Sequence, residues 1–173
     1  MSNSPLSIEQ FLRAMPKVEL HCHLFGTVRQ ATFRALAAKT GNVVTPEEID
    51  AFYTRGDKPV GVLRVLRALD AHLIVSPTDL YCLAYEYLED VHGHGVRYAE
   101  FFWNPTGTVR VSGIRYDAAQ DAIVAAIRDA QRDFGVIGRL IPSIDREAAP
   151  AEAVQMVEWM KAHRAPEVIG IGI

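Results

Sequence analysis

The sequence predicts an α/β fold in which parallel strands alternate with helices that cover them, and three observations lead to this prediction. Short apolar runs typical of strands alternate with longer segments whose apolar residues recur at helical spacing. A strand, helix, strand order of this kind implies parallel strands joined by right-handed crossovers. The predicted strands are also apolar at nearly every residue, as expected for a sheet that helices cover.

Capping signals mark the first elements. A helix is predicted over residues 7–14, where Ser7 is the N-cap and a glutamine follows three residues later. The apolar run over residues 18–24 is the first strand. A second helix is predicted over residues 30–39, with Gly41 as a stop signal just beyond it.

Three more helices are predicted before the second strand. Thr45 and the Pro-Glu-Glu that follows form a capping box with proline at the first helical position, and the short helix ends near Tyr53. Residues 55–59 form a loop, and residues 62–73 carry apolar side chains at helical spacing. The capping signature recurs at the start of a long helix over residues 76–92.

The rest of the chain alternates regularly and suggests a barrel. The expected elements are strands over 97–103, 136–144 and 168–173 and helices over 116–134 and 150–163. A natural domain rarely ends on an apolar strand, because the strand would present an unpaired edge. Four β/α units are half of an eight-stranded barrel, which usually takes about 250 residues. We therefore expect a (β/α)8 TIM-type barrel with only about its first four β/α units present.

Composition narrows the classes of function. The chain has 173 residues, 49% hydrophobic and 23% charged, with a formal net charge of −3. Charges of both signs are interspersed, so nothing favours nucleic acid or an anionic membrane as a partner. No apolar run approaches the ~20 residues of a membrane span, and no secretory signal is visible. Two cysteines, Cys22 and Cys82, are too few for a disulfide scaffold and are expected to be buried thiols in the cytoplasm.

His21 and His23 form a candidate metal site at the end of the first predicted strand. Residues two apart on a strand point the same way, with Cβ atoms roughly 6.5 to 7 Å apart. Imidazoles that lean together from this spacing fit two metal–nitrogen bonds of roughly 2.0 to 2.1 Å. Active sites of parallel α/β proteins lie at this end of the strands. The alternative is two ordinary histidines on a polar face, and Cys22 points away from both.

Two motifs resemble one enzyme family. The run Pro16-Lys17-Val18-Glu19-Leu20-His21-Cys22-His23-Leu24 is similar to the opening motif Pro-Lys-x-Glu-Leu-His-x-His-Leu of the adenosine deaminase family, in the amidohydrolase superfamily. The run Tyr98-Ala99-Glu100-Phe101-Phe102-Trp103-Asn104-Pro105 is similar to its second strand. The resemblance covers essentially the whole chain. It implies that residues 1–173 are the N-terminal half of a metal-dependent hydrolase barrel.

The resemblance also implies the chemistry. One Zn2+ would be bound by His21 and His23 together with a third His and an Asp beyond residue 173. The general acid/base Glu is also expected beyond residue 173, so this chain holds no catalytic residue and alone is expected to be inactive. The implied reaction is zinc-dependent hydrolytic deamination of a purine nucleoside, purine base or related amino-heterocycle, with water activated by the metal.

Two residues depart from the family pattern. Phe25 replaces an acidic residue that contacts the ribose hydroxyl in adenosine deaminases. A ribose hydroxyl left unpaired against it would cost roughly 1 to 3 kcal/mol, so we expect a substrate with an apolar or aromatic group there. Phe102 replaces the family's Arg, so Glu100 either pairs with another group or has a different role, for which a structural role is favoured.

Further residues are candidates for contact with the purine-like substrate. The resemblance places Gly26 beside the pocket and Leu66 and Leu69 in a lid over it, although plain helix packing explains the two leucines equally well. Asp145 and Arg146 follow the third strand, and because adjacent residues diverge we expect at most one of them, preferably Asp145, to enter the pocket. Trp103 and Asn104 are similar candidates at the end of the second strand.

Two alternatives to a purine deaminase remain at this stage. The first is another amidohydrolase chemistry on a two-metal version of the site. The second is a non-catalytic barrel fragment. A third His and a nearby Glu in the sequence after the fifth strand would favour the deaminase.

Overall fold

Three parallel strands form the centre of the protein. The computed structural model describes residues 7–54, 56 and 62–173. Within them, the sheet has the order β1-β2-β3. The strands are β1 (Lys17–His23), β2 (Val96–Trp103) and β3 (Ile137–Pro142). The parallel α/β arrangement confirms the predicted fold class.

The helices begin and end close to their predicted positions. In order, the helical elements are α1 (Ile8–Ala14), the 3₁₀ turn η1 (Leu24–Thr27), α2 (Gln30–Lys39), α3 (Pro46–Tyr53), α4 (Val62–Ala68), the π-helical turn η2 (Leu69–Leu73), α5 (Pro77–Gly93), α6 (Pro105–Ser112), α7 (Tyr116–Phe134) and α8 (Pro150–Ala162). The capping boxes at Ser7 and Thr45 are present. The predicted loop over 55–59 lies outside the described residues except for Gly56.

Two helical segments differ from the prediction. Residues 105–112 form helix α6, although the sequence analysis predicts only the end of a strand there. Asn104 is the N-cap of α6, and its side-chain oxygen accepts a hydrogen bond from Gly107 N at 3.2 Å. The predicted helix over 62–73 is α-helical only in its first part and ends in η2. π-Helical turns are rare and occur frequently at functional sites.

The fourth predicted strand is not a regular strand. Residues 168–173 run parallel to β3 but pair with it only through the bridges Leu140–Val168 and Ser143–Gly172. Gly170 and Gly172 weaken an extended strand because they have no side chain to pack. The segment therefore follows the direction of a fourth parallel strand without its regular ladder.

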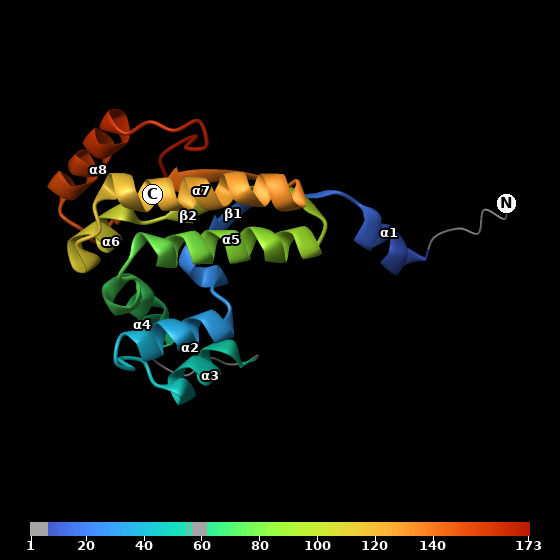
Figure 1. Ribbon diagram of the computed structural model, residues 1–173, viewed down its shortest axis with the longest axis horizontal. Coiled ribbons are helices and arrows are strands. Elements are labelled where there is room, and N and C mark those ends of the chain that lie inside the picture. Colours follow the sequence, from blue (N-terminus) through green and yellow to red (C-terminus); the bar gives the residue numbers. More distant parts are fainter. Residues whose placement is uncertain (1–6, 55, 57–61) are drawn as a thin grey trace.

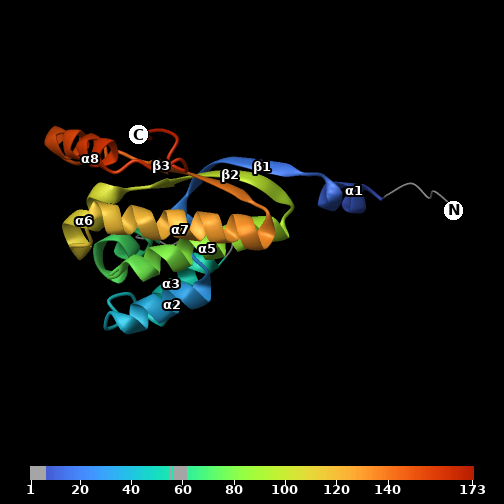
Figure 2. The ribbon, with the colours of Figure 1, turned by 45° about the horizontal axis from the view of Figure 1, so that its top comes forward.

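The sheet buries one face and leaves the other open. Helices α5 and α7 pack side by side on one face, as Figures 1 and 2 show. There, Phe101 of β2 packs against Tyr87 of α5 with ring centroids 5.4 Å apart. On the opposite face, Val18 and Leu20 of β1 are 63% and 55% exposed. In the described part of the chain, the expected cover of helices is therefore present on one face of the sheet. When parallel strands close into a barrel with the helices outside, the face that the helices leave uncovered becomes the inside of the barrel.

The cysteines agree with the prediction only in part. Both thiols are free. Cys22 is half-buried against the core, and burial raises its pKa. Cys82 is exposed, which corrects the expectation of two buried thiols, because it lies off the buried stripe of α5. No helix in the described ranges combines the length and apolarity needed to cross a membrane.

Candidate metal and substrate site

His21 and His23 stand side by side at the carboxyl end of β1. Their ring centroids are 5.4 Å apart and their planes are inclined by 67°. Two imidazoles on one tetrahedral zinc ion place their centroids roughly 5 Å apart, because each Zn–N bond is about 2.0 to 2.1 Å. The pair therefore fits one ion. The described residues contain no cluster of three or more His, Cys, Asp or Glu that could hold a metal.

A bulge in β1 explains why both imidazoles lie on the open face. Glu19 pairs with Ala99 and Cys22 pairs with Phe101, so three steps along β1 correspond to two steps along β2. The extra residue shifts the alternation of side chains, so His21 and His23 lie on the same face of β1 as the exposed residues Val18 and Leu20. Bulges re-aim side chains in this way and are over-represented next to active sites.

Glu19 stabilises this bulge through its side chain. Its Oε1 accepts a hydrogen bond from His21 N at 2.9 Å. The bond is exposed to solvent, so its net contribution to stability is about 0.5 to 1.5 kcal/mol. Glu19 therefore fixes the backbone from which the first imidazole projects.

The Glu19→Ala variant of the full-length protein is expected to bind zinc about 2- to 10-fold more weakly, because the bulge loses this acceptor. Competition with a chromogenic chelator measures the affinity. Glu19→Gln keeps an oxygen that can accept from His21 N and serves as the matched control. Equal zinc affinity for the Ala variant and the parent would exclude this role for Glu19.

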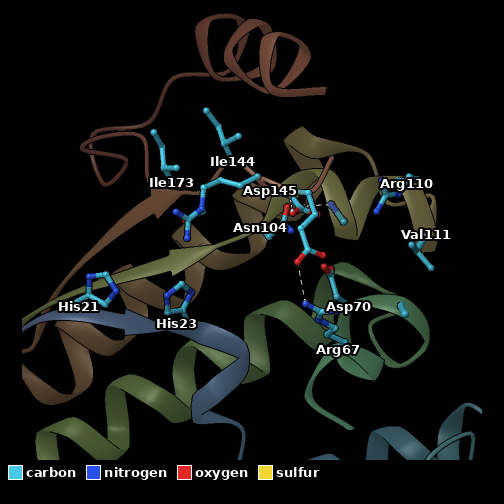
Figure 3. Close-up of a pocket in the computed structure, with 15 residues that line it drawn as sticks. His21, His23, Arg67, Asp70, Asn104, Arg110, Val111, Ile144, Asp145 and Ile173 are labelled. Carbon is cyan, nitrogen blue, oxygen red and sulfur yellow. Dashed lines mark hydrogen bonds and ion pairs between the residues drawn. The ribbon is translucent and has the colours of Figure 1, made fainter. Parts of the chain in front are cut away.

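The two imidazoles line a cavity of about 720 Å³ at the carboxyl ends of the strands. Asn104 follows β2 and Asp145 follows β3, so all three strand ends contribute to the cavity. Figure 3 shows the imidazoles at one end and Arg67, Asp70 and Arg110 at the other, on α4, η2 and α6. Active sites of parallel α/β proteins form at this edge of the sheet.

Leaving aside Leu66, the structure brings one of the four other predicted substrate-binding residues into this cavity. Asp145 lines it. Leu69 is fully buried in the core, Phe25 is half-buried against the core, and neither they nor Gly26 line the cavity. The side chain of Leu66 lies outside the described part of the structure. Substrate contact by these residues stays a prediction.

Two expectations about the strand ends need correction. Asp145 and Arg146 both line the cavity, because they lie in the turn after β3, where side chains do not alternate as on a strand. Trp103 is buried, and its Nε1 donates a hydrogen bond to Thr108 Oγ1 at 3.0 Å. Its neighbour Asn104 lines the cavity instead.

Asp70 is a cavity residue that the sequence analysis missed. Its largely buried carboxylate accepts a hydrogen bond from Thr108 Oγ1 at 3.0 Å. The other carboxylate oxygen, Oδ2, packs against Gly107, and a Cβ added at Gly107 would lie 2.0 Å from it. Burial is the main cause that raises the pKa of Asp70 to about 6, and the nearby charge of Asp145 adds to it. The hydrogen bond from Thr108 and the charge of Arg110 act in the opposite direction. A carboxyl group perturbed in this way within a cavity is typical of a functional site.

One signal for Asp70 was available in the sequence. It stands four residues after Leu66, on the apolar stripe of the predicted helix, where a carboxylate is unexpected. Arg67 carries no comparable signal, because a charged residue at that position is typical of a solvated helix face. Arg110 lies in a stretch for which no helix is predicted from the sequence.

Comparisons with known proteins agree with this geometry. The profile of the adenosine deaminase family matches residues 16–173. An adenine deaminase from Schizosaccharomyces pombe is 36% identical over 88% of this chain and 42% of its own length. An aminodeoxyfutalosine deaminase from Acidothermus cellulolyticus is 32% identical over 99% of this chain and 47% of its own length.

A solved structure is similar over nearly the whole chain. It is an amidohydrolase from Burkholderia ambifaria with bound zinc, with a TM-score of 0.91 and 63% identity over 99% of this chain and 48% of its own. The chain spans about half the length of the curated relatives it matches. The family match over residues 16–173 decides the assignment: this chain belongs to the adenosine deaminase family.

Proposed function

We propose that residues 1–173 form the N-terminal half of a zinc-dependent aminohydrolase barrel that deaminates a purine base, a purine nucleoside or a related amino-heterocycle. The observation that carries the proposal is the pair His21 and His23, with ring centroids 5.4 Å apart on the wall of the cavity. The names of the relatives, which are deaminases, and the zinc in the similar amidohydrolase support it.

The residues present fit the following roles. His21 and His23 would hold one Zn2+, with the remaining ligands and the acid/base Glu supplied from beyond residue 173. When bound, the ion supplies Lewis acidity and activates water at neutral pH. Asn104 and Asp145 line the same cavity, and their side chains can donate or accept hydrogen bonds that orient the polar edges of a heterocycle. The free thiols fit a cytoplasmic location.

Because Phe25 stands where the family has an acidic residue, we also propose that the preferred substrate of the complete site has no hydroxyl group facing it, although Phe25 does not line the cavity of the described residues. Phe25 lies on η1, directly after the ligand strand, and is half-buried against the core. An aromatic ring cannot replace the hydrogen bond that an acidic residue gives a ribose hydroxyl. Adenosine is therefore expected to be a poorer substrate than adenine or a heterocycle with an apolar substituent, by about 5- to 100-fold in kcat/KM.

Metal analysis and ammonia release from the full-length protein test the proposal. We expect one zinc per chain, and ammonia release that a chelator abolishes and added zinc restores. Adenosine turnover near the diffusional ceiling of about 10⁸ M⁻¹s⁻¹ would contradict the role of Phe25. Two metal ions per chain would instead favour a two-metal hydrolase, and zinc binding without turnover of any amino-heterocycle would favour a non-catalytic barrel.

A further inference from the structure

Phe102 touches both proposed ligand imidazoles. Its ring centroid lies 4.6 Å from that of His21 and 5.4 Å from that of His23, and the latter pair is nearly stacked, at 28°. Phe102 and His23 are direct partners across the β1–β2 pairing. Among the hydrogen bonds of the described residues, none involves a ring nitrogen of either histidine. Aromatic packing is therefore the contact that orients the two rings.

Gly172 makes room for the ring of Phe102 on its other side. A Cβ at Gly172 would lie 2.7 Å from Cδ1 and 2.8 Å from Cε1 of Phe102, and 2.7 Å from Ser143 Oγ. Real Cβ atoms do not approach other atoms this closely, so a side chain at this position would push both the aromatic ring and the serine hydroxyl. A Cβ at Gly170, two residues earlier in the same segment, would meet nothing within 4 Å. The lack of a side chain is thus required at only one of these two glycines.

We propose that Phe102, wedged between Gly172 and the two imidazoles, is a positioning residue that holds His21 and His23 in the orientation for metal binding. This inference rests on the proposed zinc site. It adds an aromatic contact that orients the two imidazoles, whose ring nitrogens make no hydrogen bond within the described residues. Metal-binding histidines are usually oriented by a hydrogen bond from the second ring nitrogen. Here the ring of Phe102 restricts both imidazoles, and its apolar surface keeps water from that side of the site.

Zinc affinity and the visible spectrum of the cobalt-substituted full-length protein test this inference. Phe102→Leu removes the ring but keeps an apolar side chain, and we expect about tenfold weaker zinc binding and a changed cobalt spectrum, because each aromatic contact accounts for roughly a 2- to 10-fold effect. Phe102→Tyr keeps the ring and is expected to restore the affinity and spectrum of the parent.

Gly172→Ala provides a second test that leaves Phe102 in place. The added Cβ displaces the ring, so we expect a similar loss of affinity and a similar spectral change. Gly170→Ala is the matched control and is expected to match the parent. Thermal unfolding of the metal-free variants shows whether each one folds.

The outcomes separate this inference from the proposed function. If the parent binds one zinc and both Phe102→Leu and Gly172→Ala keep its affinity and cobalt spectrum, the positioning role is wrong and the zinc site stands. If the folded parent binds no zinc, the proposed function is wrong and the positioning role falls with it.

Discussion

The His21→Ala and His23→Ala variants of the full-length protein are each expected to bind zinc more than about 100-fold more weakly than the parent. Loss of an outer partner of a metal ligand already costs about 10- to 100-fold, and loss of a ligand itself costs more. The effect is expected to be large for both residues, because their imidazoles share one face of β1 and stand 5.4 Å apart. Deaminase activity is expected to disappear with the metal.

Chelator competition measures the loss, and His94→Ala is the matched control. His94 is exposed, caps the carboxyl end of α5 and does not line the cavity. Its removal is expected to leave the zinc content unchanged. Full zinc affinity in either ligand variant would refute the assignment of that residue as a ligand.

The Asp70→Asn variant is expected to be more stable than the parent above pH 7, by up to about 3 kcal/mol in the free energy of unfolding. Burial raises the pKa of Asp70 in the folded protein from its ordinary value of 3.8 to about 6. Between these two values the unfolded chain has already lost the proton that the folded chain keeps. Stability contributed by this group is therefore complete below pH 3.8 and is lost as the pH rises through about 6.

Urea unfolding of the parent and of Asp70→Asn between pH 4 and 8 measures this effect. The difference in unfolding free energy is expected to grow in favour of the Asn variant between about pH 4 and 6 and then to level off. Thr108→Val removes a hydrogen bond that lowers the pKa of Asp70 in the folded protein, so it is expected to move the upper limit of this window to higher pH while the lower limit stays in place. A difference that does not change with pH would contradict a buried, titrating Asp70.

The closeness of the His21 and His23 side chains could be predicted from the sequence, but the reason for their geometry could not. The spacing of His21 and His23 indicates that they point the same way, and it also places them on the face opposite Val18 if β1 is regular. The bulge between Glu19 and Cys22 places all of them on one face instead. A register shift of this kind depends on the pairing with β2, which local sequence does not encode.

Helix α6 and the exposure of Cys82 also differ from the prediction, although the sequence carries signals for both. Asn104 followed by proline marks a helix start as well as a strand end, and the poor helix formers after it, including Gly107, weaken the helical pattern of this stretch. Cys82 lies off the buried stripe formed by Leu80 and Leu83 on α5, so helical periodicity alone predicts its exposure. The position of Asp70 on the apolar stripe of its predicted helix indicates that it faces the core, but nothing local shows that α6 would cover it.

The open face of the sheet has a consequence for biosynthesis. Val18 and Leu20 remain more than half exposed after α5 and α7 have packed, and Ile171 at the far edge is 48% exposed. Residues 1–173 on their own therefore expose an apolar surface next to an unpaired edge of the sheet. Chaperones bind surfaces of this kind, and aggregation starts from them. Coexpression with a chaperone is accordingly expected to raise the recovered yield of this segment when it is produced alone.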